Sequence, residues 1–268
     1  MLGEYEQLPE TATGSVEALQ AYMHQNEVQF VKLFFTDPFG KFQSWRIPAE
    51  KFKGEQTETF FDGSSIRGWQ GIEESDMRVV PDVSTAFMDP FPLHKTVGII
   101  CDVFDPVKGA HYSRDPRRVA KAAEEYLRAT GMATHAYFGP EQEFFLFDDV
   151  QFSVEHGTVE AYSRESMTGL QRGSHRNTDT KANYPMRPKE AYFSGPAQDA
   201  YEDVRADMVL AMKAVGLDVD KDTHEVAPGQ HEMGTKYDSL VRAADKAMLL
   251  RYVIKGVARK HGLYATFM

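Results

Sequence analysis

Hydrophobic positions along this chain follow two periods. Apolar residues recur every three or four positions in several stretches, which predicts helices over residues 15–26, 114–131, 197–216 and 237–262. Alternating or continuous apolar runs bounded by Gly, Pro and Asp predict strands within 28–48, 77–82, 96–105, 139–148, 217–238 and 263–268. Residues 28–48 should form a hairpin, because DPFGK supplies a turn between its two runs.

The order of these elements predicts an α+β protein with two parts. Strands dominate before residue 110, with a single early helix, so residues 1–110 should form a small domain on an antiparallel or mixed sheet. The segment 106–115 is rich in turn formers, which places a boundary there and assigns residues 111–268 to a second domain. Residues 149–197 are polar, with only scattered apolar residues, and predict an excursion with little regular structure.

The stretch GPEQEFFLFD, residues 139–148, is the first with candidate chemistry. Glu141 and Glu143 are two residues apart on a predicted strand, so they should share one face, about 7 Å from each other. Two carboxylates held side by side favour a bound cation, because like charges are otherwise costly to bury. The alternative is that this end of the strand is solvated and the glutamates are only surface charge.

A second acidic stretch lies in LDVDKDTHEVAPGQHEMGTKYD, residues 217–238. The sequence Ala-Pro-Gly at 227–229 predicts a reversal, so Glu225 and Glu232 can sit opposite each other on paired strands. With the first pair this makes four carboxylates, which suit two hard divalent cations such as Mg²⁺ or Mn²⁺. His224 and His231 alternate out of phase with these glutamates and are predicted to support the site, to pack behind it or to serve occasionally as ligands.

Composition narrows the possible partners. The chain has 40 acidic and 30 basic residues, a formal net charge of −10, which disfavours nucleic acid and anionic membranes as partners. Its single cysteine, Cys101, lies in an apolar run, which predicts a buried thiol and a reducing compartment. No apolar run reaches the roughly 18 residues of a membrane span, and the N-terminus lacks the pattern of a signal peptide, so a cytoplasmic protein is expected.

Three polar segments have structural as well as functional interpretations. The loop FFDGSSIRGWQGIEESDM, residues 60–77, could approach a ligand and expose Trp69, although Asp62–Ser65 is also typical of a tight turn. The charges of the helix over 114–131 are predicted to form a solvated face. The basic residues between 172 and 189 could steer an anion but are better explained as solvated charge.

Three motifs, FFDGSSIRGWQGIEESDM, GPEQEFFLFDD and HEVAPGQHE, occur in this order and at spacings that resemble the bacterial type I glutamine synthetase family. The resemblance runs from about residue 15 to the end of the chain. It implies an N-terminal β-grasp domain followed by a catalytic domain whose curved antiparallel sheet lines a funnel with two Mg²⁺ or Mn²⁺ ions. It also implies a dodecamer of two stacked hexameric rings, whose active sites are shared between neighbouring copies.

The same resemblance implies roles for individual residues. Glu143, Glu225 and Glu232 correspond to the ligands of one metal, and Glu141 corresponds to a ligand of the other. Asp62 and Ser65 correspond to an ammonium site presented to the neighbouring subunit, in which Asp62 and Glu225 would help to deprotonate ammonium. Tyr192 matches a residue that lines this pocket, and Tyr237 matches an aromatic position beside the adenine of ATP. The implied reaction joins ammonium to L-glutamate through γ-glutamyl phosphate.

The resemblance also implies that part of the active site is missing from the given sequence. In that family the chain continues past the position of Met268 with a histidine ligand, a further glutamate and substrate-binding arginines. We therefore expect little synthetase activity from the 268 residues alone, and full turnover in a γ-glutamyl hydroxamate assay would contradict this. Two alternatives stay open: a ligase that uses an amine or polyamine as acceptor, and a non-catalytic assembly subunit.

Overall fold

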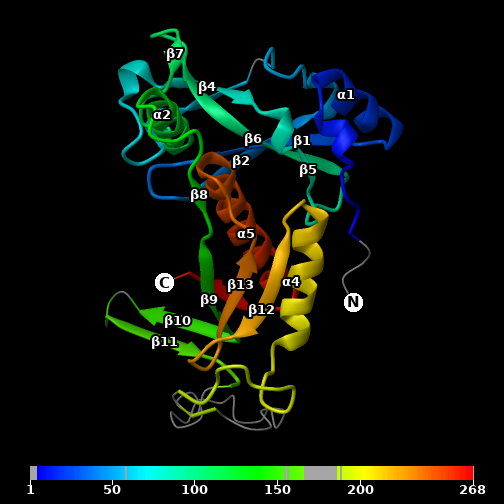
Figure 1. Ribbon diagram of the computed structural model, residues 1–268, viewed down its shortest axis with the longest axis vertical. Helices are drawn as coiled ribbons and strands as arrows, with labels where there is room; N and C mark the ends of the chain where they lie inside the picture. Colours follow the sequence, from blue (N-terminus) through cyan, green and yellow to red (C-terminus); the bar gives the residue numbers. More distant parts are fainter. Residues whose placement is uncertain are drawn as a thin grey trace.

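The structure is a computed structural model that describes residues 5–57, 59–153, 155, 157–165, 186–187 and 189–267. Figure 1 shows two sheets, one in the N-terminal half of the chain and one in the C-terminal half, with helix α5 (Leu240–Lys260) running between them. The α+β class is confirmed. One set of buried apolar side chains lies within the N-terminal half of the chain. A second set joins the C-terminal sheet and helix α5 to Phe34 and Phe87 of the N-terminal sheet.

The N-terminal sheet has seven strands: β1 (Phe30–Thr36), β2 (Phe42–Pro48), β3 (Phe60–Asp62), β4 (Asp76–Pro81), β5 (Phe87–Met88), β6 (Thr96–Asp105) and β7 (Ala110–His111). Its main order is β2-β1-β6-β4-β3, and β5 and β7 also pair with β6. β1 and β6 are parallel while the other pairs are antiparallel, so the sheet is mixed as expected. The predicted hairpin is confirmed, with Phe30 opposite Pro48.

Helix α1 (Val16–Gln25) covers part of this sheet and begins where the sequence predicts. The Ser15 Oγ accepts a hydrogen bond of 3.1 Å from the backbone N–H of Ala18, which satisfies one free donor of the first turn. Five short 3₁₀ helices lie within the described ranges and connect other elements. They are η1 (Glu10–Thr13), η2 (Ala49–Lys51), η3 (Gly63–Ser65), η4 (Ile72–Glu74) and η5 (Val83–Thr85).

Trp69 is buried, contrary to the expectation that its loop exposes it. Its side chain is 0% exposed and packs 5.5 Å from the ring of Phe35 and 5.1 Å from the ring of Tyr112, measured between centroids. The prediction failed because the polar sequence around Trp69 gives no sign that the loop folds back over the sheet. The indole is an anchor for this loop and cannot serve as an exposed contact residue.

The C-terminal sheet has four antiparallel strands in the order β12-β13-β9-β15: β9 (Glu141–Phe147), β12 (Val219–His224), β13 (Gln230–Thr235) and β15 (Tyr264–Thr266). Helix α4 (Glu202–Ala214) and helix α5 cover one face of this sheet (Figure 1). Apolar residues from both helices, including Met208 and Val253, form one core with Phe144 and Leu146 of β9. The helix predicted over residues 197–216 therefore packs into the core, although it begins later than predicted and Ala200, which precedes it, is exposed.

Two further strand pairs complete the fold. β8 (Tyr137–Phe138) pairs with β14 (Asp238–Ser239), and β10 (Asp149–Ser153) pairs with β11 (Thr158–Tyr162). The β10–β11 hairpin corrects part of the expectation for residues 149–197, where little regular structure was predicted. Its two strands, DVQFS and TVEAY, do alternate, but each does so over only five residues of an otherwise polar segment. Arg172, Arg176 and Lys181, predicted as part of a basic segment, lie outside the described residues.

Helix α2 (Pro116–Ala129) turns part of its charged side inward. Arg117 is buried, whereas Val119 is 56% and Tyr126 is 71% exposed. The expectation of a fully solvated charged face is wrong for this helix, because Arg117 has acidic partners on three other segments. Its guanidinium lies 2.7, 2.8 and 3.0 Å from the carboxylates of Asp82, Asp102 and Asp245, respectively. This cluster joins α2, α5 and the N-terminal sheet.

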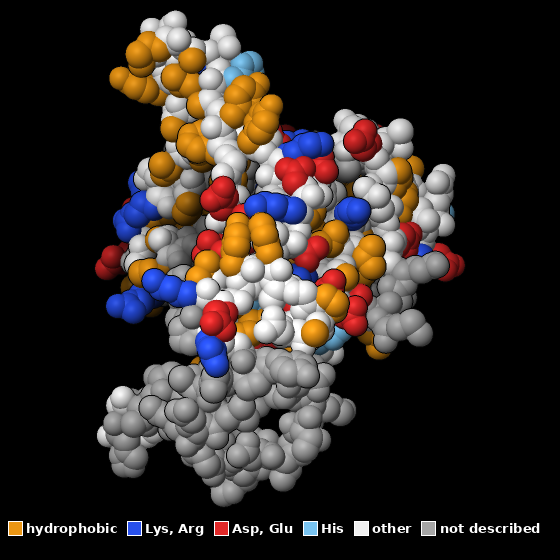
Figure 2. All heavy atoms as spheres, turned by 60° about the horizontal axis from the view of Figure 1, so that its bottom comes forward, with side chains coloured by type: hydrophobic (Ala, Val, Ile, Leu, Met, Phe, Trp, Pro, Cys, Tyr) orange, Lys and Arg blue, Asp and Glu red, His pale blue; other side chains and the backbone are white. Residues whose placement is uncertain are grey.

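The surface carries both signs of charge. On the face in Figure 2, acidic and basic side chains are interspersed, and hydrophobic side chains gather on the projection at the upper left. None of the helices in the described ranges combines the length and the apolar character needed to cross a membrane.

Candidate functional site

The face of the C-terminal sheet that the helices leave uncovered carries the predicted glutamates. In β9, Phe144 and Leu146 point into the core, so Glu141 and Glu143 project from the opposite face. Glu143 is paired directly with Glu232 of β13, and Glu141 is paired with Gly234. Directly paired residues share a face, so β9 and β13 present three carboxylates together.

The turn between β12 and β13 adds Glu225 to this face. Gly229, with φ of +74°, completes the predicted Ala-Pro-Gly reversal, and the Glu225 backbone N–H donates a 2.8 Å hydrogen bond to the Gln230 carbonyl. The residue opposite Glu232 is Thr223, not Glu225 as predicted. The partner of Glu232 thus lies two residues before the predicted one on β12. Because side chains alternate along a strand, a shift of two residues keeps Glu225 on the same face as Glu232.

These carboxylates have few compensating partners. The pKa of Glu225 is raised by partial burial and by the neighbouring Glu232 carboxylate, with a smaller contribution from Glu143. The Lys221 ammonium lies 3.7 Å from the Glu232 carboxylate, and the Gln230 amide donates a 2.7 Å hydrogen bond to Glu143. A raised carboxyl pKa beside like charges is typical of sites where a cation or a proton is required.

The donor set fits a hard divalent cation. Carboxylate oxygens are the preferred ligands of Mg²⁺ and Mn²⁺, and Glu143, Glu225 and Glu232 come from two neighbouring strands and the turn beside them. Within the described residues, no three of these glutamates have carboxylate oxygens that all lie within 4.8 Å of one another. The glutamates therefore share a face and a charge imbalance, and ion binding would require their side chains to turn toward one point.

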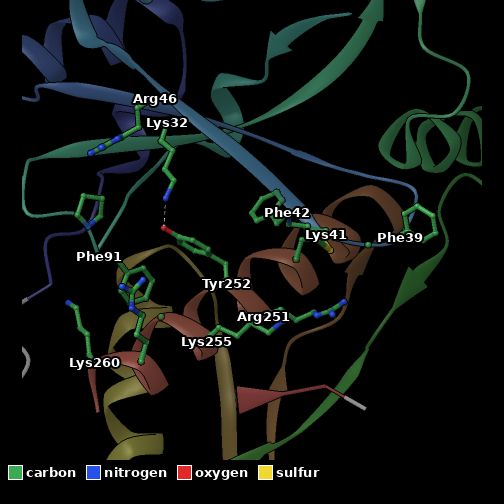
Figure 3. A pocket seen from close by; sticks show the side chains of 15 residues that line it. Lys32, Phe39, Lys41, Phe42, Arg46, Phe91, Arg251, Tyr252, Lys255 and Lys260 are labelled. Atoms are coloured by element: carbon green, nitrogen blue, oxygen red, sulfur yellow. Dashed lines mark hydrogen bonds between the residues drawn. The ribbon is translucent and has the colours of Figure 1, made fainter. Parts of the chain in front are cut away.

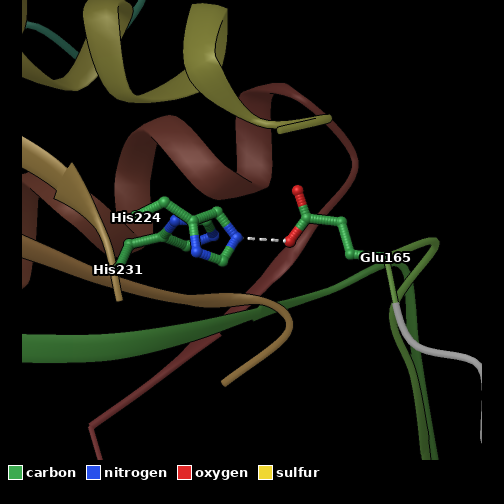
Figure 4. Close-up of side chains that lie close together, drawn as sticks. All are labelled: Glu165, His224 and His231. Carbon is green, nitrogen blue, oxygen red and sulfur yellow. Dashed lines mark hydrogen bonds and ion pairs between the residues drawn. The ribbon is translucent and has the colours of Figure 1, made fainter. Parts of the chain in front are cut away.

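A second cluster, Glu165, His224 and His231, is buried under the turn (Figure 4). His224 Nε2 lies 2.8 Å from the Glu165 carboxylate, and its Nδ1 lies 2.8 Å from the Glu225 carbonyl. The Glu225 carbonyl is an acceptor, and so is the Glu165 carboxyl when it is ionised; in that state both ring nitrogens of His224 donate. Burial acts to lower the pKa of His224, but the hydrogen bond and charge of Glu165 outweigh it and raise the pKa.

This buried cluster is better suited to fixing the turn than to holding a metal. Glu165 also accepts a 2.9 Å hydrogen bond from the Gly229 backbone N–H, so it ties His224 to the reversal that carries Glu225. His231 Nδ1 lies 3.3 Å from the Arg205 guanidinium, and burial lowers the pKa of His231 well below its usual value. A metal here would have to displace the hydrogen bonds of His224. The prediction that both histidines lie out of phase with the glutamates is confirmed.

The two tyrosines named by the sequence are both exposed. Tyr237 is 65% exposed, lies against Gly139 just before β9, and makes an edge contact with Tyr137 at 5.4 Å between ring centroids. Tyr192 is 52% exposed and stacks on Phe193 at 4.0 Å, next to the end of β12, because the Phe193 backbone N–H donates to the His224 carbonyl. Tyr237 therefore lies near the beginning of the strand with Glu141.

Asp62 and Ser65 lie on the other sheet. Asp62 ends β3 and accepts hydrogen bonds from Ser64 Oγ at 2.6 Å and Ser65 Oγ at 2.8 Å, so the tight turn is present. These hydrogen bonds lower the pKa of the exposed Asp62 carboxyl, so it is anionic at neutral pH. Within the described part of one chain, no hydrogen bond or ion pair links Asp62 or Ser65 to the four glutamates.

Glu165 and Arg205 were not identified from the sequence. Glu165 lies in a polar segment, 59 residues before its partner His224. Arg205 is on α4 and is buried against Asp199 at 2.7 Å and Asp222 at 2.9 Å. The only signal for Arg205 was a cation within an otherwise apolar helical stripe, which is not specific. Long-range charge pairs of this kind leave no periodic pattern in a sequence.

Two family models match the chain. The model described as "Glutamine synthetase, beta-Grasp domain" matches residues 27–106, and the model described as "Glutamine synthetase, catalytic domain" matches residues 113–268. Among curated relatives, the glutamine synthetase of Aquifex aeolicus is 47% identical over 244 residues, covering 90% of this chain and 51% of the relative. That of Salmonella typhimurium is 43% identical over 260 residues, covering 95% of this chain and 55% of the relative.

A solved structure supports the fold. The cryo-EM structure of Plasmodium falciparum glutamine synthetase superimposes with a TM-score of 0.86 at 24% identity, covering 99% of this chain and 51% of that chain. The chain thus spans about half the length of the curated relatives it matches.

Proposed function

Because this chain belongs to the glutamine synthetase family, we propose that its protein ligates ammonia to L-glutamate with ATP, through γ-glutamyl phosphate, and releases L-glutamine. One observation carries this proposal. Three glutamates on β13, β9 and the adjoining turn share the open face of the C-terminal sheet, where partial burial and the neighbouring Glu232 carboxylate raise the pKa of Glu225.

Glu143, Glu225 and Glu232 would hold one Mg²⁺ or Mn²⁺ ion, and Glu141 would contribute to a second. When bound, such ions neutralise the phosphates of ATP and the carboxylate of glutamate, which makes phosphoryl transfer feasible. The protein's own contribution is to hold these oxygens on a rigid sheet. The buried Glu165–His224 pair fixes the turn that carries Glu225, since it binds both the Gly229 N–H and the Glu225 carbonyl.

Tyr237 and Tyr192 are proposed to line the substrate sites. The exposed Tyr237 ring near the beginning of β9 could stack on adenine, and Tyr192 could border the ammonium pocket. Asp62 and Ser65 would contribute to the ammonium site of a neighbouring copy, which is supported by the exposure and anionic state of Asp62. Glu225 would act with Asp62 to bind ammonium and help to remove its proton.

This arrangement requires an assembly of identical chains, which we propose to be two stacked hexameric rings. The exposed apolar residues of α2, including Val119 and Tyr126, are the kind of surface that another polypeptide segment covers. A cytoplasmic location agrees with the buried, unpaired Cys101.

Binding of Mn²⁺ tests the proposal without depending on turnover. Free Mn²⁺ is measured by electron paramagnetic resonance during titration of the chain. Glu232→Gln should weaken binding at least tenfold, because it removes one charged ligand. Glu202→Gln, an exposed change on α4, is the matched control and should leave the affinity unchanged. No Mn²⁺ binding by the wild-type chain, or equal binding by Glu232→Gln, would refute the metal site.

A further inference from the structure

A large pocket separate from the glutamates lies between the seven-stranded sheet and helix α5. Its volume is about 1090 Å³. One side is formed by β1, β2 and the turn between them, and the other by the C-terminal half of α5 (Figure 3). No lining residue belongs to the four-stranded sheet, so the pocket is distinct from the site proposed above.

Among the residues that the structure describes, every charged side chain that lines this pocket is basic. These residues are Lys32, Lys41, Arg46, Arg251, Lys255, Arg259 and Lys260. The chain as a whole has ten more acidic than basic residues, so the clustering of basic side chains at this pocket is opposite in sign to the net charge of the protein. Within the described residues only Lys32 has an acidic partner, Asp89, at 3.1 Å. The pocket therefore has a strong positive potential that the described structure does not neutralise.

The spacing on α5 makes this charge unfavourable for the helix itself. Arg251, Lys255 and Arg259 follow one another at four-residue intervals, and like charges at that spacing repel. The pKa of Lys255 is lowered by burial and by the charge of Arg251. Cations in a last helical turn interact well with the helix dipole, which explains Arg259 and Lys260. That explanation does not extend to Arg251 and Lys255, which lie further from the end.

Several of these cations are already held in place. Lys32 donates hydrogen bonds to Asp89 at 3.1 Å and to the Tyr252 hydroxyl at 2.7 Å, and Figure 3 shows Lys32 pointing toward Tyr252. Lys260 donates to the Pro90 carbonyl at 3.1 Å, and the Arg251 guanidinium lies 5.2 Å from the Phe267 ring centre. Groups fixed before binding lose less conformational entropy when a ligand arrives.

We propose that this pocket binds a small molecule with two or more phosphate groups. Guanidinium groups bind phosphate through paired N–H donors and lysines add point charge, so a ligand with several anionic groups can engage both walls. A single carboxylate would neutralise only one of the basic side chains. The volume of about 1090 Å³ is slightly above the roughly 300–1,000 Å³ of typical small-molecule sites, and Phe42 and Phe91 supply apolar walls.

Calorimetric titration with inorganic tripolyphosphate, without divalent ions, tests this proposal. The wild-type chain should bind one tripolyphosphate, and Arg251→Gln with Lys255→Gln should weaken binding at least tenfold. Arg128→Gln with Lys213→Gln removes two exposed cations elsewhere and should change the affinity less than twofold. Citrate distinguishes phosphates from carboxylates. Absent tripolyphosphate binding, equal loss in both double variants, or citrate binding as tight as tripolyphosphate would overturn the proposal.

Thermal unfolding provides a second measurement, in which the double variant should be at least as stable as the wild type although it binds tripolyphosphate less tightly. Removing two repelling charges should leave the Tm of the unliganded Arg251→Gln, Lys255→Gln variant equal to or above that of the wild type. Tripolyphosphate should raise the Tm of the wild type but not that of the variant. A lower Tm of the unliganded variant would mean that these cations stabilise the fold and would overturn the proposal. Glu232→Gln should bind tripolyphosphate normally, which separates this pocket from the proposed metal site.

Discussion

Replacing Arg117 with methionine should destabilise the protein by leaving a group of aspartates without their cation. The Arg117 side chain is only 6% exposed, and its guanidinium is 2.7–3.0 Å from three carboxylates. Methionine keeps much of the volume but none of the charge. Breaking a buried ion pair by removing one partner typically costs about 3–5 kcal/mol. Lys121, 2.5 Å from Asp102, still compensates one of the three, so we expect a loss of about 3 kcal/mol.

The assay is urea unfolding at pH 7, followed by circular dichroism and by tryptophan fluorescence. Arg118→Met is the matched control, since Arg118 is the next residue in α2 and pairs at 2.8 Å with Glu125 on the exposed side. That pair is solvated, so its loss should be a small fraction of the effect at Arg117. Adding Asp245→Asn to Arg117→Met should restore part of the stability, because it removes one of the uncompensated charges.

Two results would refute this reasoning. Equal losses for Arg117→Met and Arg118→Met would show that burial of the network is irrelevant. A loss below about 1 kcal/mol for Arg117→Met would mean that the aspartates find water or protons at little cost.

Three further predictions concern single buried positions. Burial raises the pKa of Asp115 to about 6, so the folded state binds a proton here more readily than the unfolded state. As pH falls from 7 to 4, the unfolding free energy of the wild type should therefore rise by up to about 3 kcal/mol relative to that of Asp115→Asn. A difference between the two proteins that does not change with pH would contradict this. Cys101 is 1% exposed and burial raises its thiol pKa, so a thiol-reactive disulfide reagent should label it only after unfolding, and rapid labelling of native protein would be inconsistent with the structure. A Cβ on Gly98 would lie 2.4 Å from the Phe87 ring, so Gly98→Ala should cost about 1–3 kcal/mol in urea unfolding. Gly139→Ala, whose Cβ would meet only an ordinary contact at 3.5 Å, serves as its control, and equal stability of the two variants would argue against the clash.

The sequence predicted the elements whose side chains follow a clear period. The aromatic run FFLF after Gly-Pro located β9, and the two-residue spacing of Glu141 and Glu143 put them on one face of it. Ala-Pro-Gly located the turn beside Glu225. These features are local, because strand periodicity and turn chemistry act over a few residues.

Features that depend on distant partners were missed. Arg117 is buried because it forms ion pairs with aspartates from three other segments, and the periodicity of a helix does not predict such long-range contacts. Trp69 is inside because its loop folds over the sheet, although the surrounding residues are polar. The strands of the β10–β11 hairpin are only five residues long, so each alternates over just two apolar positions within a polar segment. The opposite residue of Glu232 was misplaced by two positions because the exact start of strand pairing depends on the turn geometry.

The division of β9 into a covered and an uncovered side affects how sequence changes in this region would be noticed. Phe144 and Leu146 are needed for the protein to fold, so damage to them would reduce its yield and thermal resistance. Glu141 and Glu143 are exposed and lie outside that core, so their replacement should leave the yield and the thermal stability of the protein unchanged. A screen that scores variants only by expression or melting would pass such replacements as harmless. Variants in this strand should therefore be judged by ion binding as well as by folding.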